Sequence, residues 1–179
     1  MQACGELLSE LGYAATTTNR IAERAGVNIA SLYEYFPGKD AIVAQVAERL
    51  FGRVLRRLAE GAATLRAAPP DEVIRRWVHV IYETVAGEQP LVGVLAHQVP
   101  YAAALETARA SSARLLAFTE RLHRHAGDLA RRDISRVEMQ LIVNLTSSTI
   151  LQLVLDPPEG LSARQVLDEL GDRLETWIR

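Results

Sequence analysis

The residues of this chain best suited to binding chemistry lie within residues 26–40, which read GVNIASLYEYFPGKD. Asn28 can begin a short helix, because its side-chain oxygen accepts hydrogen bonds from the free N–H groups of a first turn. Pro37 disfavours helical geometry at Phe36 and is expected to end that helix. Leu32 and Phe36 are spaced to form one inward edge. The remaining side chains of the helix are expected to point outward, available for contact: Ile29, Ala30, Ser31, Tyr33, Glu34 and Tyr35.

A second helix is predicted immediately before this stretch. The apolar positions of residues 16–25 follow one helix side, and Gly26 suits the left-handed conformation that ends a helix. Thr16 or Thr17 is the expected N-cap, and hydroxyls at that end can bind a phosphate; the alternative is that the threonines only cap and space a turn. Helix, glycine turn and short helix form the helix-turn-helix motif, whose second helix enters the DNA major groove.

Two charged residues near this motif have alternative interpretations. Lys39 is expected at the start of a long helix, where a cation interacts unfavourably with the helix dipole and destabilises the helix by ~0.3 to 1 kcal/mol. A phosphate partner would reverse that effect. A solvated surface charge is the alternative. Glu34 can accept a hydrogen bond from a cytosine amine or be solvated, and solvation is the favoured interpretation.

The charge balance argues against a strongly basic DNA-binding surface. The formal net charge is −2, and residues 1–65 contain seven Lys/Arg against seven Asp/Glu. DNA-binding units are usually basic, because neutralised phosphates release counterions and drive association. The motif therefore supports DNA binding and the composition does not. The neutral N-terminal part keeps open a different class of protein, a helical dimeric protein-interaction scaffold with weak or lost DNA binding.

Helical spacing of apolar residues continues through the rest of the chain without strand-like alternation, which predicts an all-α protein. A first helix is expected over residues 2–11, and a long helix over residues 40–65 that is broken by Pro69 and Pro70. Asp71 is expected to restart the next helix. Further helices are predicted over residues 91–98, 102–126, 136–155 and 163–178.

The last two predicted helices carry clear start signals and an excess of apolar residues. Ser135 with Glu138, and Ser162 with Gln165, have the spacing of capping boxes. Excess apolar surface on terminal helices indicates a dimer face, and burial within one chain is the alternative. The residues assigned to this face are Leu145, Leu151, Leu167, Leu170, Leu174 and Trp177.

Several other classes of protein are not supported by the sequence. Cys4 is the single cysteine and cannot form an internal disulfide, which favours a reducing, cytoplasmic setting. No apolar run approaches the ~20 residues needed to cross a bilayer. His123 and His125 do not share a helix face, and no Cys, Asp or Glu completes metal spacing around them. We therefore expect no enzyme activity, no metal, no cofactor and no membrane partner.

The segment TTTNRIAERAGVNIASLYEYFPGKDAIVAQV resembles the DNA-binding headpiece of the tetracycline-repressor (TetR) family of transcriptional regulators. The resemblance implies a three-helix headpiece over residues 1–46 and a helical effector-binding and dimerisation domain over residues 47–179, whose last two helices form a four-helix dimer interface. By the same resemblance, Thr17, Thr18, Tyr33 and Lys39 would touch phosphates. Ile29, Ala30, Ser31 and Tyr35 would face bases or backbone. The family usually has a longer basic lead into its first helix, whereas here Met1 lies almost inside that helix.

The resemblance also implies how such a protein works. It suggests a homodimeric repressor of a palindromic operator, released by a small apolar or aromatic molecule whose binding opposes DNA binding. Pocket candidates are aromatic and histidine side chains of the middle helices: Trp77, Tyr82, His97, Tyr101 and Phe118. Core packing is the alternative for each of them.

Overall fold

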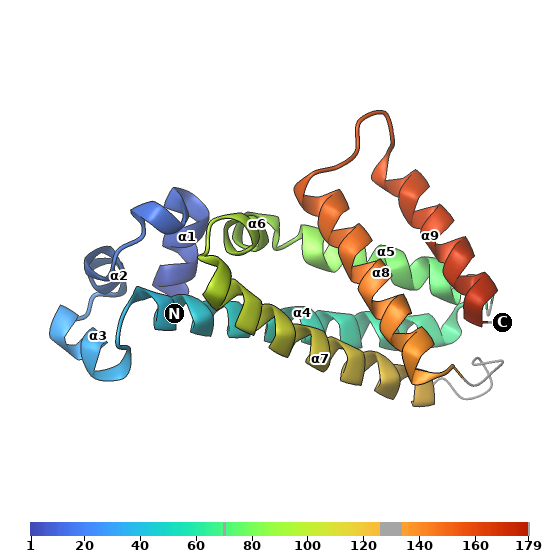
Figure 1. The fold of residues 1–179 in the computed structure, drawn as a ribbon, viewed down its shortest axis with the longest axis horizontal. Helices are drawn as coiled ribbons and strands as arrows, with labels where there is room; N and C mark the ends of the chain where they lie inside the picture. Colours follow the sequence, from blue (N-terminus) through green and yellow to red (C-terminus); the bar gives the residue numbers. More distant parts are fainter. Residues whose placement is uncertain (70, 126–133, 179) are drawn as a thin grey trace. The chain divides into compact units, whose positions relative to one another are not determined.

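The computed structural model describes residues 1–69, 71–125 and 134–178, and among these the regular elements are all helices. The description does not extend to the side chains of residues 66, 101–110 and 125. The predicted all-α class is therefore confirmed (Figure 1).

The chain divides into two compact units. One unit comprises Met1–Arg53 and Glu88–Ser111, and the other comprises Val54–Gly87 and Ser112–Arg179. Two of the three divisions fall inside long helices, α4 (Lys39–Thr64) and α7 (Tyr101–His125), so that each of these helices contributes to both units. The third division lies between Gly87 and Glu88.

The first unit contains the predicted helix-turn-helix. Its helices are α1 (Gln2–Ala15), α2 (Thr18–Ala25), α3 (Ile29–Tyr35), the start of α4, α6 (Gln89–His97) and the start of α7. The helix predicted over residues 2–11 continues to Ala15 after a break at Gly12, whose φ is 78°. The buried apolar side chains of this unit are Ala3, Cys4, Leu7, Leu8, Ile21, Ala22, Ile42, Val43, Val46, Leu50, Leu91 and Val94.

The second unit is built on α5, α8 and α9. It holds the end of α4, a 3-10 turn (Leu65–Ala67), α5 (Val73–Ala86), the end of α7, α8 (Arg136–Leu155) and α9 (Ala163–Ile178). Figure 1 shows α5 beside the antiparallel pair α8 and α9, and all three contact one another. Their shared core consists of Val78, Ile142, Ile150, Leu153, Leu167 and Leu174.

The start signals of the last two helices act as predicted. The Ser135 hydroxyl accepts from the Glu138 N–H at 3.2 Å, and the Glu138 carboxylate accepts from the Ser135 N–H at 2.9 Å. Ser162 and Gln165 make the same two bonds before α9. The helix expected to restart at Asp71 begins at Val73 instead, because the N–H of Glu72 donates to the Pro69 carbonyl at 2.9 Å and forms a turn.

A glycine sets how closely α9 approaches α5. A Cβ atom added at Gly171 would lie 2.9 Å from Cα and 3.2 Å from Cβ of Arg75, which is closer than real Cβ atoms come to backbone. Any side chain at Gly171 must therefore separate α5 from α9, which supply Val78, Leu167 and Leu174 to this core.

We expect Gly171→Ala to lower the free energy of unfolding by about 1 to 3 kcal/mol, because an overpacked contact forces backbone shifts. Urea denaturation measures the change. Gly5→Ala is the matched control, since its added Cβ meets only Val46 Cγ1 at 3.8 Å and alanine favours a helix over glycine by about 1 kcal/mol. Equal stability of Gly171→Ala and the wild type would contradict this packing account.

Candidate nucleic-acid interface

The helix-turn-helix is formed by short-range hydrogen bonds at three positions. The N-cap of α2 is Thr17, whose hydroxyl accepts from the Arg20 N–H at 3.3 Å. Gly26 has φ 67° and ψ 31°, the left-handed conformation expected there. Asn28 caps α3 by accepting from the Ala30 N–H at 2.8 Å. The cap, turn and helix boundaries of this motif thus match the sequence analysis.

The outward surface of α3 carries two exposed tyrosines. Tyr33 is 52% exposed and Tyr35 is 78% exposed. Ala30, Ser31 and Glu34 are exposed as well. Ile29 differs from expectation, because it is half-buried on the same side as Leu32 and Phe36, three and seven positions further along the chain.

The two helices of the motif are joined through hydroxyl groups. Thr18 Oγ1 and Tyr33 Oη lie 3.1 Å apart and form a hydrogen bond between α2 and α3. Thr18 and Tyr33 are two of the four residues expected to touch phosphates, and a third, Thr17, is exposed beside Thr18. The structure therefore brings a group of hydroxyls to one side of α3.

The fourth expected phosphate contact, Lys39, is held by Tyr13. Lys39 Nζ donates to the Tyr13 carbonyl at 3.0 Å and lies 3.7 Å from the centre of the Tyr13 ring. The Tyr13 hydroxyl donates to the Asp40 carboxylate. Burial, followed by this hydrogen bond, raises the pKa of Tyr13 to about 12, so that the phenol stays protonated. These contacts offset the unfavourable position of a cation at the start of α4.

The other two cations of residues 1–46 also have internal partners. Arg20 donates to the Ala15 carbonyl at 2.7 Å. Arg24 donates to both carboxylate oxygens of Glu10, at 3.0 and 2.9 Å, and lies 3.6 Å from Glu6. The Arg24 hydrogen bond holds the pKa of Glu10 below its usual value. Residues 1–46 contain three Lys/Arg against five Asp/Glu, so the headpiece has no excess of positive charge to attract DNA.

The pocket candidates are distributed over both units. Trp77 and Tyr82 are half-buried on α5, and Phe118 is buried on α7, all in the second unit. His97 is exposed at the end of α6 in the first unit. Tyr101 begins α7, and its side chain lies outside the described residues.

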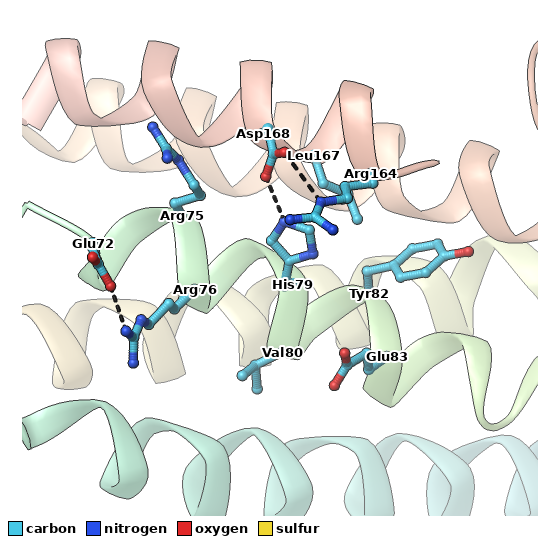
Figure 2. A pocket seen from close by; sticks show the side chains of 10 residues that line it. All are labelled: Glu72, Arg75, Arg76, His79, Val80, Tyr82, Glu83, Arg164, Leu167 and Asp168. Carbon is cyan, nitrogen blue, oxygen red and sulfur yellow. Dashed lines mark hydrogen bonds and ion pairs between the residues drawn. The ribbon is translucent and has the colours of Figure 1, made fainter. Parts of the chain in front are cut away.

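A surface groove of about 620 Å³ lies against α5 and α9, and Tyr82 is the only one of these candidates that lines it (Figure 2). Some of its charged side chains pair with one another: His79 Nε2 lies 2.8 Å from Asp168 Oδ1, and Arg76 pairs with Glu72. The hydrogen bond from His79 is the main reason why the pKa of Asp168 is lowered. This groove is therefore lined largely by charged side chains of both signs, unlike the apolar pocket expected from the sequence.

The residues assigned to a dimer face fall into two groups. Leu145, Leu151 and Trp177 are exposed. Leu167 and Leu174 are only 1% and 4% exposed and belong to the core of their own unit, and Leu170 packs against that core. For Leu167 and Leu174, burial within one chain is the correct interpretation, because they lie on the side of α9 that packs against α5.

Two exposed apolar residues of α8 were not assigned to the dimer face from the sequence. Val137 and Leu141 are exposed and lie eight and four positions before Leu145, which places all three on one helix side. By length and composition α8 could cross a membrane, contrary to the expectation that no apolar run is long enough, and 33% of its most apolar 18-residue stretch is buried in the protein. Its opposite side supplies Ile142, Ile150 and Leu153 to the core. The exposed stripe of Val137, Leu141 and Leu145 could have been predicted from the sequence by assigning the apolar residues of this helix to its two sides.

No group of three His, Cys, Asp or Glu side chains in the described part of the chain is arranged to hold a metal ion. Cys4 is fully buried, and burial raises the pKa of its thiol to about 11, which disfavours the reactive thiolate.

The geometry of α2, Gly26 and α3 is that of a helix-turn-helix protein. Residues 2–46 match the family model described as bacterial regulatory proteins, tetR family. The fold of the whole chain is similar to that of the fatty acid degradation regulator FadR from Bacillus halodurans, with a TM-score of 0.70 and 15% sequence identity over 99% of this chain and 93% of that one. Residues 2–46 therefore match the DNA-binding domain of the tetR family of bacterial regulatory proteins, and the chain as a whole shares the fold of the FadR regulator.

Two curated proteins share parts of the sequence. The HTH-type transcriptional regulator YerO of Bacillus subtilis, described as uncharacterized, is 24% identical over 136 residues, which are 69% of this chain and 47% of that protein. The nucleoid occlusion factor SlmA of Aliivibrio fischeri is 37% identical over 71 residues, which are 37% of this chain and 36% of the SlmA chain. The matched region thus spans about half or less of the length of these relatives.

Proposed function

We propose that this protein is a cytoplasmic, ligand-responsive repressor that binds a palindromic operator as a homodimer. DNA binding is assigned to residues 1–46, and effector binding and dimerisation to residues 47–179. The observation that carries the proposal is the Thr18–Tyr33 hydrogen bond, 3.1 Å long, which joins the two helices of the motif beside the exposed surface of α3. A helix presented in this way fits the major groove of DNA.

The proposed contacts with DNA follow from the surfaces of α2 and α3. Thr17, Thr18 and Tyr33 offer hydroxyls to phosphates, and Lys39 offers an ammonium that must share its contacts with Tyr13. Ile29, Ala30, Ser31 and Tyr35 are assigned to bases or backbone; Ile29 is the least accessible of these four. Phosphate contacts position the protein, and base contacts supply the specificity.

The proposed dimer uses the exposed stripe of α8. Val137, Leu141 and Leu145 present apolar side chains in a row, with Leu151 on the same helix and Trp177 on α9 also exposed. Apolar surface of this kind on a soluble protein is favourable to bury against a second copy. A dimer also offers two recognition helices to two operator half-sites one DNA turn apart.

The proposed effector is a small apolar or aromatic molecule. Trp77, Tyr82, His97, Tyr101 and Phe118 remain its candidate contacts, supported for Trp77 and Tyr82 by their half-buried positions on α5. An effector that favours the conformation with low DNA affinity must itself bind more weakly when DNA is bound.

A second candidate function is that of a helical dimeric protein-interaction scaffold with weak or lost DNA binding. The internal pairing of Arg20, Arg24 and Lys39 favours it, because these cations are the only ones in residues 1–46. A gel shift with DNA flanking the protein's own gene separates the two candidates. Specific binding at physiological salt supports the repressor, and its absence supports the scaffold.

For the repressor, we expect Tyr33→Ala and Lys39→Ala to weaken binding to all DNA sequences by about fivefold to tenfold, the effect of losing roughly one kcal/mol of hydrogen bonding. Lys39→Ala should also reduce the slope of log affinity against log salt by about one. Fluorescence anisotropy with a labelled operator measures both changes. Glu60→Ala, at an exposed position of the second unit, is the control; tight, unchanged binding by both headpiece variants would refute their assignment.

For the dimer, we expect Leu145→Glu to give monomers at micromolar concentration, because two charges would be buried without partners in the interface. Light scattering reports the mass, which for the wild-type dimer is twice 19.7 kDa. Leu11→Glu introduces the same change at an exposed leucine of α1 and should leave the dimer intact. A wild-type monomer, or a dimer that tolerates Leu145→Glu, would contradict the proposed interface.

A further inference from the structure

Glu34 lies at the centre of the outward surface of α3. Successive side chains of a helix are separated by about 100° around its axis. If the half-buried Ile29 and Leu32 mark the inward direction, Glu34 projects about 170° away from it, and Ala30 and Ser31 lie at about 130° on either side. The residue farthest from the protein core on this helix is therefore a glutamate flanked by two small side chains.

The carboxylate of Glu34 is uncommitted. Among the residues that the structure describes, it has no hydrogen-bond or ion-pair partner, whereas the neighbouring Tyr33 is held by Thr18 at 3.1 Å. Ala30 and Ser31 are short enough to let α3 approach the floor of a groove closely. An α-helix, about 10 to 12 Å across with its side chains, also fits within a major groove about 12 Å wide.

An ionised carboxylate in the major groove selects among the bases by its chemistry. It only accepts hydrogen bonds, and it is repelled by phosphates and by the acceptor atoms of guanine and thymine. The N4 amine of cytosine is a donor without a neighbouring acceptor on the same base, whereas adenine presents the acceptor N7 beside its N6 amine. If the carboxylate entered the groove without a donor, its lost hydration would not be replaced. Cytosine is therefore the base that best fits Glu34.

We propose that Glu34 determines operator specificity by accepting a hydrogen bond from the N4 amine of a cytosine in each half-site. This inference rests on the proposed function, in which α3 enters the major groove. It assigns to Glu34 a role in base recognition, in place of the solvated charge that the sequence analysis favours.

The test is selection of binding sites from a pool of random double-stranded DNA by the full chain and by Glu34→Gln. The wild type should select a half-site with one position where cytosine is preferred by about tenfold over other bases. Glu34→Gln should shift that position from cytosine to adenine, because an amide can both accept from N6 and donate to N7. The other positions of the site should not change.

Glu23→Gln is the matched control, because it removes the same charge from an exposed position of α2. It should keep the cytosine preference. Retained cytosine in Glu34→Gln, or the same shift in both variants, would overturn the inference while leaving operator binding intact. Failure of the wild type to select any sequence would instead overturn the proposed function and this inference together.

Discussion

The orientation of α3 depends on the left-handed turn at Gly26. The Gly26 N–H donates to the carbonyls of Ala22 and Glu23, and the Val27 N–H donates to the Ala22 carbonyl at 3.0 Å. A helix of seven residues is too short to be stable alone in water, and α3 has no fully buried side chain. Its position therefore relies on this turn, the Asn28 cap and the Thr18–Tyr33 hydrogen bond. The same weak burial leaves most of the α3 surface available for a groove.

Charge imposes a second constraint on how such a headpiece can bind DNA. Its three cations each make internal contacts, and Lys39 in particular stabilises the junction between α1 and α4 through Tyr13. Counterion release can therefore supply little of the affinity. Short-range contacts by α3, doubled in a dimer, would have to supply the rest of the affinity. Because the Glu34 carboxylate is favourable only opposite a hydrogen-bond donor, the affinity also depends on the base sequence.

The motif could be predicted from the sequence because its signals are local. Thr17, Gly26, Asn28 and Pro37 each act within a few residues of their own position, as the observed caps and turn show. The Lys39–Tyr13 contact could not be predicted in this way, because 26 positions separate its members and no helical period connects them.

The dimer face shows a different limit of sequence reasoning. Leu167 and Leu174 have the apolar spacing of an interface, yet they are buried in the core of their own unit. Periodicity identifies an apolar helix side without identifying what covers it. Val137 and Leu141 were left out of the dimer face for the same reason, since α8 has apolar residues on both its core side and its exposed side.

We propose that this headpiece recognises DNA more by the fit of α3 into the groove than by charge. The most direct measurement is the slope of log affinity against log salt for a selected operator and for random DNA. We expect clear preference for the operator and a slope shallower than the value of about −5 to −9 that six to ten neutralised phosphates produce. A steep slope with equal affinity for both DNAs would contradict it.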